Sequence, residues 1–282
     1  MGAPPWDVLI NGEPVAPEAA TVSVFDIGFQ RGYGCFEGMR SYSGRVFRSR
    51  EHIERLVASA QSLKIPTVDP SVIAGWVDNR ASASGDAVVR VFVTGGTNPA
   101  ILGTNSKTIV TAEPLPGIPT ALTLLPVRAP WHSDGTDSEL TGAKTMSYGP
   151  NVAATQSAKA AGFDDALLVG SHNHVLEGPT YSIGWIRQGV LETPALGHGI
   201  LASITRAAIV EVARGAGITI VEGVFVMDRL AEADEVFVMS TVREILPVVA
   251  VGDRRYLAGP VTNQLQMGFR DLVAAELGLV RP

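Results

Sequence analysis

The chain has 282 residues, of which 46% are hydrophobic and 18% are charged, and its formal net charge is −6. This composition excludes a disordered chain, and the length suits two domains or one large domain. The acidic balance argues against a nucleic-acid-binding protein, because contact with phosphates needs a basic face.

The single cysteine, Cys35, excludes an internal disulfide framework and a cysteine-based metal cluster. The longest apolar runs, such as 245–251, are too short to cross a bilayer. The first residues lack the basic and apolar regions of a signal peptide. We therefore expect a soluble, cytoplasmic enzyme with no membrane, nucleic-acid or metal partner.

The first part of the chain predicts a hairpin, a helix and two strands. The hairpin covers 7–15 and turns at an Asn-Gly pair. The apolar residues of 51–63 recur at helical spacing, which indicates an amphipathic helix. The β-branched ranges 87–94 and 107–112 are typical of strands.

A proline-rich stretch follows these elements. Residues 113–119 contain three prolines, which is typical of a linker. We therefore place the domain boundary there, between an N-terminal α/β domain of residues 1–115 and a C-terminal domain of residues 116–282.

The second part alternates between strand and helix patterns around a polar loop at 131–139. Strands are predicted at 121–127, 165–169, 174–177 and 235–239, and helices at 151–161, 205–215 and 261–277. Mixed elements in both halves indicate an α/β (α+β) fold.

Lysine is unusually scarce in this chain. The 22 basic residues include only four lysines, at positions 64, 107, 144 and 159. Lysine forms Schiff bases and has a tunable pKa, whereas arginine stays charged and holds anions. If a lysine is used chemically, it is one of these four.

Several short motifs could carry chemistry. Lys144 lies in a small-residue stretch with Tyr148 four positions on, and Glu177 precedes a glycine at the end of an expected strand. The hydroxyl residues at 203 and 205, and those at 240 and 241, could hold an anion at a helix start and in a turn. Taken singly, each has a simpler explanation, such as a solvated lysine, a turn, an N-cap or a surface ion pair.

Together and in order, these motifs resemble one family. The range 22–38 (VSVFDIGFQRGYGCFEG) resembles the N-terminal signature of the fold-type IV pyridoxal-phosphate enzymes. The motifs that follow it in family order are 48–56, 142–144, 162–168, 175–178, 204–206, 234–237, 240–241 and 259–262. The chain is therefore identified as a member of the class IV aminotransferases, over essentially its whole length.

The resemblance assigns roles around pyridoxal 5′-phosphate. It implies that Lys144 is the Schiff-base lysine, which also carries the proton between the substrate Cα and the cofactor. It implies that Glu177 keeps the pyridine nitrogen protonated and that Tyr148 faces the phenolic oxygen. The remaining cofactor-binding residues, which would hold the phosphate, are Arg55, Ser203, Ile204, Thr205, Ser240 and Thr241.

Within the family, the branched-chain aminotransferases are the most similar subgroup. Phe36, Arg40 and Arg90 fall where that subgroup has residues near its substrate pocket. The D-amino-acid subgroup clamps the substrate carboxylate with an arginine and a histidine in a loop that here reads Thr-Asn-Pro-Ala-Ile-Leu, at 97–102. Loss of such a charge-assisted contact costs about 1.5–3 kcal/mol.

Three positions depart from the branched-chain pattern. Arg31 replaces a tyrosine that usually faces the pocket, and Ser203 replaces a glycine. In 179–185, Ser182 stands in place of an asparagine, and Trp185 adds bulk. Arg31 could anchor the carboxylate of an acidic substrate, or it could face solvent or a partner subunit.

The preferred function is transfer of an amino group between a branched-chain-like L-amino acid and a 2-oxo acid. An (R)-amine or D-amino acid transaminase and an aminodeoxychorismate lyase-like β-elimination are the alternatives. A cofactor-binding homologue without catalysis is disfavoured, because binding alone does not need Lys144. The resemblance also implies a small N-terminal and a larger C-terminal domain, with the cofactor in their cleft, and a homodimer.

Overall fold

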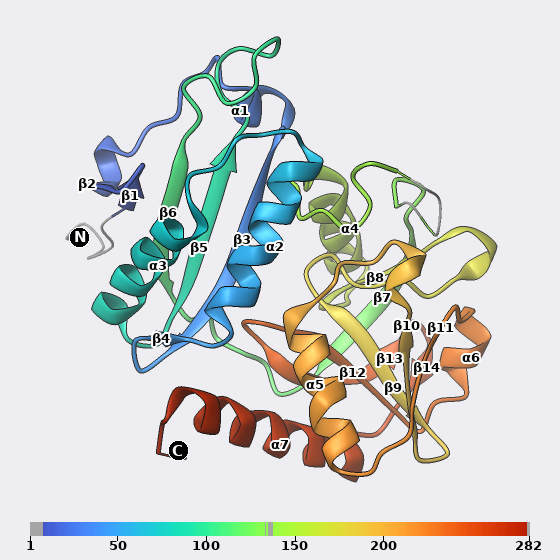
Figure 1. Cartoon of the computed structure of the whole chain (residues 1–282). Helices are drawn as coiled ribbons and strands as arrows, with labels where there is room; N and C mark the ends of the chain where they lie inside the picture. The colour runs from blue at the N-terminus through green and yellow to red at the C-terminus, as the bar shows by residue number, and fades with distance from the viewer. Residues whose placement is uncertain (1–7, 133, 135–137, 281–282) are drawn as a thin grey trace. The chain divides into compact units, whose positions relative to one another are not determined.

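The computed structural model describes residues 8–132, 134 and 138–280, which form two compact units (Figure 1). The first unit comprises Met1–Pro116 together with Ala143–Tyr148, and the second comprises Gly117–Gly142 together with Gly149–Pro282. Lys144 therefore belongs to the first unit, whereas the sequence pattern placed it in the domain 116–282. A domain boundary between residues 115 and 116 stays a prediction.

The first unit is built on a six-stranded sheet in the order β2-β1-β6-β5-β3-β4, in which the pairs are antiparallel. Its strands are β1 (Val8–Ile10), β2 (Glu13–Val15), β3 (Gly34–Tyr42), β4 (Arg45–Val46), β5 (Ala87–Thr94) and β6 (Thr108–Pro114). Its helices are η1 (Pro17–Ala19), α1 (Ile27–Arg31), α2 (Ser49–Ser62) and α3 (Pro70–Ser84).

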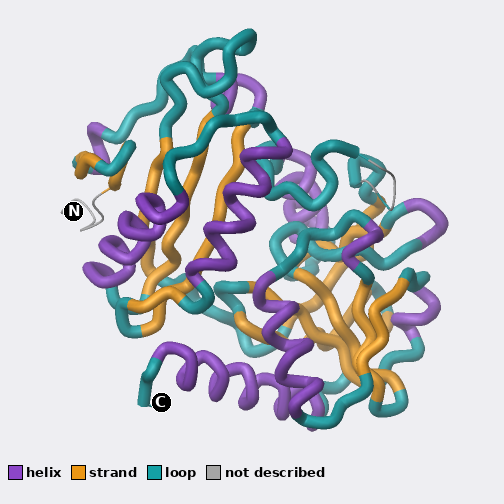
Figure 2. The backbone as a smooth tube through the Cα atoms, in the orientation of Figure 1, coloured by secondary structure: helices purple, strands orange, loops and turns teal. Residues whose placement is uncertain are grey.

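Alternation along the strands gives this sheet a buried face. Met39 on β3 and Val91 on β5 are fully buried and belong to one core with Leu56 of α2 and Ile73 of α3. Figures 1 and 2 show α2 and α3 side by side along this face, and these helices contact β3, β5 and β6. The opposite face of β3 and β5 is only partly buried.

The second unit is built on an eight-stranded mixed sheet in the order β11-β10-β9-β12-β13-β7-β8, with β14 paired to β13. Its strands are β7 (Leu122–Arg128), β8 (Asp165–Val169), β9 (Ser182–Arg187), β10 (Val190–Pro194), β11 (Ile220–Gly223), β12 (Glu235–Ser240), β13 (Glu244–Val251) and β14 (Arg254–Arg255). Its helices are α4 (Gly149–Ala160), η2 (Ser171–Asn173), η3 (Leu196–His198), α5 (Ile204–Gly215), α6 (Met227–Ala231) and α7 (Pro260–Leu277).

Helices pack against this sheet in two places. In Figure 1, α5 and α7 lie next to each other, and both contact β12, while α4 contacts β7 and β8. α5 buries Ile209 and Ala213 at helical spacing, and α7 buries Leu265, Phe269 and Val273 in the same way. The amphipathic pattern that predicted α7 therefore marks the face that this helix buries, whereas the start and stop signals of 205–215 predicted α5.

The α/β class and most predicted elements are confirmed, and one strand was wrong. Residues 174–177 form only isolated bridges, His174 with Val226 and Val175 with Val169. The reason is that successive residues pair with different segments, so no ladder forms. Of the polar loop 131–139, residues 133 and 135–137 lie outside the described residues.

Helix α3 was not predicted, although its start carries a recognisable signal. Asp69 accepts a hydrogen bond from the backbone N–H of Ser71, and Pro70 occupies the first turn.

Among the described residues, no helix combines the length and the hydropathy needed to cross a membrane.

Candidate active site

The stretch that carries Lys144 is fixed by its backbone in the first unit. The Phe36 N–H donates to the Lys144 carbonyl (3.0 Å), and the Met146 N–H donates to the Gly34 carbonyl (2.8 Å). The Lys144 N–H donates to the Ser59 hydroxyl of α2 (3.0 Å). A Cβ on Gly34 would lie 2.6 Å from the Met146 sulfur, so glycine permits this close approach. These contacts hold the lysine through main-chain atoms.

The Lys144 amine lies between two aromatic side chains. Its Nζ is 3.3 Å from the Tyr148 hydroxyl and 4.4 Å from the centroid of the Phe36 ring. The two rings meet edge to face, with centroids 5.1 Å apart. Three residues that the family resemblance assigned to the site therefore form one cluster. An amine over an aromatic face is held by a cation–π contact while it is protonated.

On the buried face of β3, Glu37 contacts two residues of α2. Arg55 donates to both Glu37 oxygens, from Nε and from Nη2, each at 2.7 Å, and His52 Nδ1 lies 2.8 Å from Glu37 Oε2. Glu37 is fully buried and His52 nearly so, whereas the Arg55 side chain keeps 13% of its surface exposed. Arg55, assigned above to the cofactor phosphate, is therefore also the counter-ion of a buried carboxylate. A phosphate contact by Arg55 stays a prediction.

The charge states in this network follow from its contacts. Burial by itself would raise the pKa of Glu37, but the charge of Arg55 and the hydrogen bonds from His52 and Arg55 outweigh it and lower the pKa to about 2. Burial lowers the pKa of His52. At neutral pH the network therefore contains one carboxylate, one guanidinium and a neutral imidazole.

Acid should destabilise the first unit through Glu37. Because its folded pKa is about 2 against an ordinary 4.5, its stabilisation is complete above pH 4.5 and is lost as the pH falls towards 2. The shift corresponds to about 3 kcal/mol. Urea unfolding between pH 7 and pH 3 measures it, and a Glu37→Gln variant should lose less stability over that range. The same pH dependence in both proteins would contradict this origin.

The predicted substrate residues share the partly buried face of the sheet. Phe36 and Arg40 alternate with buried residues of β3, and Arg90 on β5 pairs with Gly38 of β3. The Arg40 guanidinium lies 4.6 Å from the Tyr42 ring centroid, and Arg90 forms an ion pair with Glu113 at 2.6 Å. One face thus presents an aromatic ring and two guanidinium groups.

Arg31 lies at the end of α1. The helix is anchored at its start by Asp26, which caps it and accepts a hydrogen bond from Thr94. Arg31 is exposed and lines a hollow of about 250 Å³, whose other lining residues are Ile27, Tyr33, Pro99 and Leu102. The loop at 97–102, which lacks a cation of its own, therefore faces an arginine across this hollow.

In the second unit, Glu177 is held by a backbone and a side-chain donor. The Leu201 N–H lies 3.2 Å from its Oε1 and 3.3 Å from its Oε2, and His132 Nε2 lies 3.2 Å from Oε1. The Glu177 side chain is 15% exposed. A largely buried carboxylate with two donors suits a cationic N–H partner.

The start of α5 gathers hydroxyl and amide donors. Ser203 caps the helix by accepting from the Arg206 N–H, so the amides of Ile204 and Thr205 begin the first turn. The buried Thr205 hydroxyl lies 3.4 Å from the Thr241 hydroxyl. This donor set fits an anion with several oxygen acceptors, such as a phosphate ester.

Two further predicted residues are engaged within the second unit. The Ser240 hydroxyl accepts from the Arg243 N–H at 3.3 Å, so it closes the turn after β12. Trp185 is fully buried, and its Nε1 donates to Glu192 at 2.8 Å. The bulk that departs from the family pattern at Trp185 is therefore part of the core.

Comparison with known proteins agrees with this geometry. Residues 34–251 match the family model of the class IV amino-transferases. A Methanocaldococcus jannaschii protein named as a putative branched-chain-amino-acid aminotransferase is 34% identical over 94% of this chain and 96% of its own length. The D-alanine aminotransferase of Listeria monocytogenes is 32% identical over 96% of this chain and 97% of its own.

The solved structures are similar in the same way. The branched-chain aminotransferase of Thermoproteus uzoniensis with norvaline superposes with a TM-score of 0.87 at 28% identity, covering 96% of this chain and 95% of that one. The chain belongs to the class IV aminotransferases. It is a transaminase that uses pyridoxal phosphate. The amine in the first unit, and the carboxylate and anion-binding donors in the second, each suit one part of that cofactor.

The partners of these residues were not predicted from the sequence. Glu37 appeared only inside a motif, and His52 and His132 carried no assigned role. Asp134, His174 and His198, which converge in the second unit, also went unnoticed because their separations of 40 and 24 residues match no ligand spacing. Five histidines in 282 residues were the available signal.

Proposed function

We propose that this enzyme transfers an amino group between a branched-chain-like L-amino acid and a 2-oxo acid, with Lys144 as its catalytic residue. The observation that carries the proposal is the Lys144 Nζ, 3.3 Å from the Tyr148 hydroxyl and against the Phe36 ring. A hydroxyl at this distance can exchange a proton with the amine and orient it. Lys144 would hold the cofactor through its amine and move the proton at the substrate Cα.

The other roles follow from the chemistry of each group. Pyridoxal phosphate, when bound, withdraws electrons from the substrate Cα. Glu177 would hold a proton at the pyridine nitrogen, and Tyr148 would donate to the phenolic oxygen. The phosphate would be held by Arg55 and by the donors Ser203, Ile204, Thr205, Ser240 and Thr241.

The substrate assignment rests on one face of a sheet and on the relatives. Phe36 offers apolar surface, whereas Arg40 and Arg90 offer cations for a carboxylate. The Thermoproteus enzyme was solved with norvaline, an amino acid with an apolar side chain. Because the Listeria relative is named a D-alanine aminotransferase, D-amino acids are the second candidate donor.

We also propose a cytoplasmic homodimer. Phe25 and Phe29 near α1, and Ile101 in the loop after β5, keep 69%, 71% and 65% of their surface exposed. Large apolar side chains gathered on one part of a surface mark a protein interface. Light scattering of the purified enzyme measures the assembly, and a Phe29→Glu variant should shift it towards monomer.

The function is tested by the visible absorption spectrum of the purified enzyme during donor titration. L-Leucine, L-valine and L-isoleucine should convert the cofactor to its pyridoxamine form, and D-alanine and (R)-amines should do so at least 10-fold less efficiently. Conversion by D-alanine alone would favour the second candidate. Release of pyruvate from an aminodeoxychorismate substrate would establish elimination instead.

Arg31 is expected to set selectivity for acidic substrates. In Arg31→Ala, kcat/KM for L-glutamate should fall by about 10-fold while that for L-leucine changes little, since a charge-assisted contact is worth about 1.5–3 kcal/mol. Arg50→Ala removes an exposed arginine from α2 and is the matched control. Equal losses for glutamate and leucine would disprove the anchor.

A further inference from the structure

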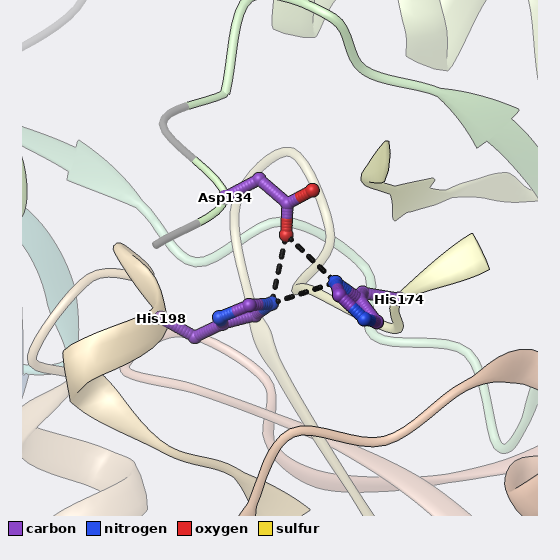
Figure 3. Close-up of side chains that lie close together, drawn as sticks. All are labelled: Asp134, His174 and His198. Atoms are coloured by element: carbon purple, nitrogen blue, oxygen red, sulfur yellow. Dashed lines mark hydrogen bonds and ion pairs between the residues drawn. The ribbon is translucent and has the colours of Figure 1, made fainter. Parts of the chain in front are cut away.

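Three side chains of the second unit bring their polar atoms to one point (Figure 3). His198 Nε2 lies 2.7 Å from Asp134 Oδ1, and His174 Nδ1 lies 3.2 Å from the same oxygen. The two imidazole nitrogens are 3.1 Å apart. Asp134 comes from the loop after β7, His174 follows η2, and His198 ends η3.

These three atoms form a triangle, and no placement of protons on the two nitrogens satisfies all three contacts. If both nitrogens carry a proton, two N–H groups point at each other across 3.1 Å. If either nitrogen is unprotonated, its lone pair faces a lone pair of the Asp134 carboxylate. A cation at the centre would satisfy every member at once, because all three atoms would then present lone pairs to it.

The surroundings fix the carboxylate in this orientation. The Ser171 hydroxyl donates to Asp134 Oδ2, which leaves Oδ1 directed at the two histidines. A Cβ on Gly170 would lie 2.6 Å from the Asp134 carboxyl carbon, so the bare backbone of this glycine makes room for the group. The carboxylate is thus anchored from two sides before any ligand binds.

The histidines are held by their own main chain. The His174 N–H donates to the Ser171 carbonyl, and the His198 N–H donates to the Ala195 carbonyl. Anchored ligands lose little freedom when a metal binds.

We propose that Asp134, His174 and His198 form a binding site for a divalent transition metal of the Zn²⁺ type. Two imidazoles and one carboxylate are a common ligand set for zinc, whereas Ca²⁺ and Mg²⁺ prefer oxygen ligands alone. A metal about 2 Å from each ligand atom fits over a triangle with sides of 2.7, 3.1 and 3.2 Å. The three side chains keep 7%, 20% and 9% of their surface exposed, so a fourth ligand can reach the metal from solvent.

The proposal itself is independent of the transamination, because binding of the metal is measured directly.

The test uses the untagged, cofactor-loaded, full-length enzyme after treatment with a chelator. Equilibrium dialysis against Zn²⁺ with elemental analysis should give one metal per chain. Co²⁺ should produce the visible d–d absorption of a low-coordinate site at the same stoichiometry. Zn²⁺ should then abolish this absorption by displacement.

Variants assign the metal to these residues. His198→Ala should lower the affinity for Zn²⁺ at least 100-fold, whereas His172→Ala, an exposed neighbour, should leave it unchanged. Asp134→Asn keeps the shape of the side chain and should lower the affinity for Zn²⁺ at least 10-fold. This variant takes the place of His198→Ala if the latter does not fold. Less than 0.1 metal per wild-type chain, or equal binding by wild type and either ligand variant, would overturn the proposal.

Discussion

Replacing Lys144 with alanine should abolish turnover while the fold survives. The Lys144 backbone atoms, not its side chain, make the hydrogen bonds to Phe36 and Ser59, so the variant keeps those contacts. Loss of a positioned general base costs about 10²–10⁴-fold, and loss of the covalent link adds to it, so we expect kcat to fall by about 10⁴-fold or more. The visible band of the lysine-bound cofactor should disappear as well.

Two further lysine variants make the result specific. Lys144→Arg keeps a positive charge but lacks a tunable amine, so it should be as inactive as Lys144→Ala. Lys159→Ala removes an exposed lysine from α4 and should behave as wild type. Circular dichroism monitors the fold in each case. If Lys144→Ala kept both the absorption band and normal turnover, another lysine would be the reactive one.

Glu37→Ala should strongly destabilise the first unit. It leaves Arg55 and His52 facing a cavity without their shared carboxylate, and removal of one partner from a buried ion pair costs about 3–5 kcal/mol. The measurement is the free energy of unfolding in urea at pH 7. The variant should also bind the cofactor more weakly, because Arg55 would no longer be fixed.

Glu54 provides a matched control on the same helix. It accepts from Arg50 at 2.8 Å, almost the distance of the buried pair, but the two side chains are 58% and 86% exposed. Solvent screens an exposed pair, so Glu54→Ala should destabilise the protein far less than Glu37→Ala. If the two variants lost equal stability, burial would not be what makes the Glu37 network important.

Local sequence patterns determined the elements that bury one continuous face. The 3.6-residue spacing of apolar side chains predicted α2 and α7, because packing against a sheet requires that spacing. The start and stop signals of 205–215 predicted α5. Strand β5 was predicted with its observed bounds, because a run of β-branched residues is typical of a strand. The irregular segment 174–177 has the composition of a strand, yet its residues pair singly with different neighbours, which no local pattern reveals.

For the active site, the sequence supplied the reactive group and the class of chemistry. Four lysines and an ordered set of motifs pointed to Lys144 and to pyridoxal phosphate. The α5 start was also readable, because hydroxyl residues before a helix satisfy its first amides. These features depend on neighbours within a few residues along the chain.

Only the tertiary structure decided which distant side chains meet. Glu37 meets Arg55 because β3 packs against α2, and Asp134 meets His174 and His198 because three separate loops converge. Arg31 faces the loop at 97–102 across a hollow for the same reason. Such contacts are set by how the elements pack in three dimensions, and the spacing of residues along the chain carries no record of that packing.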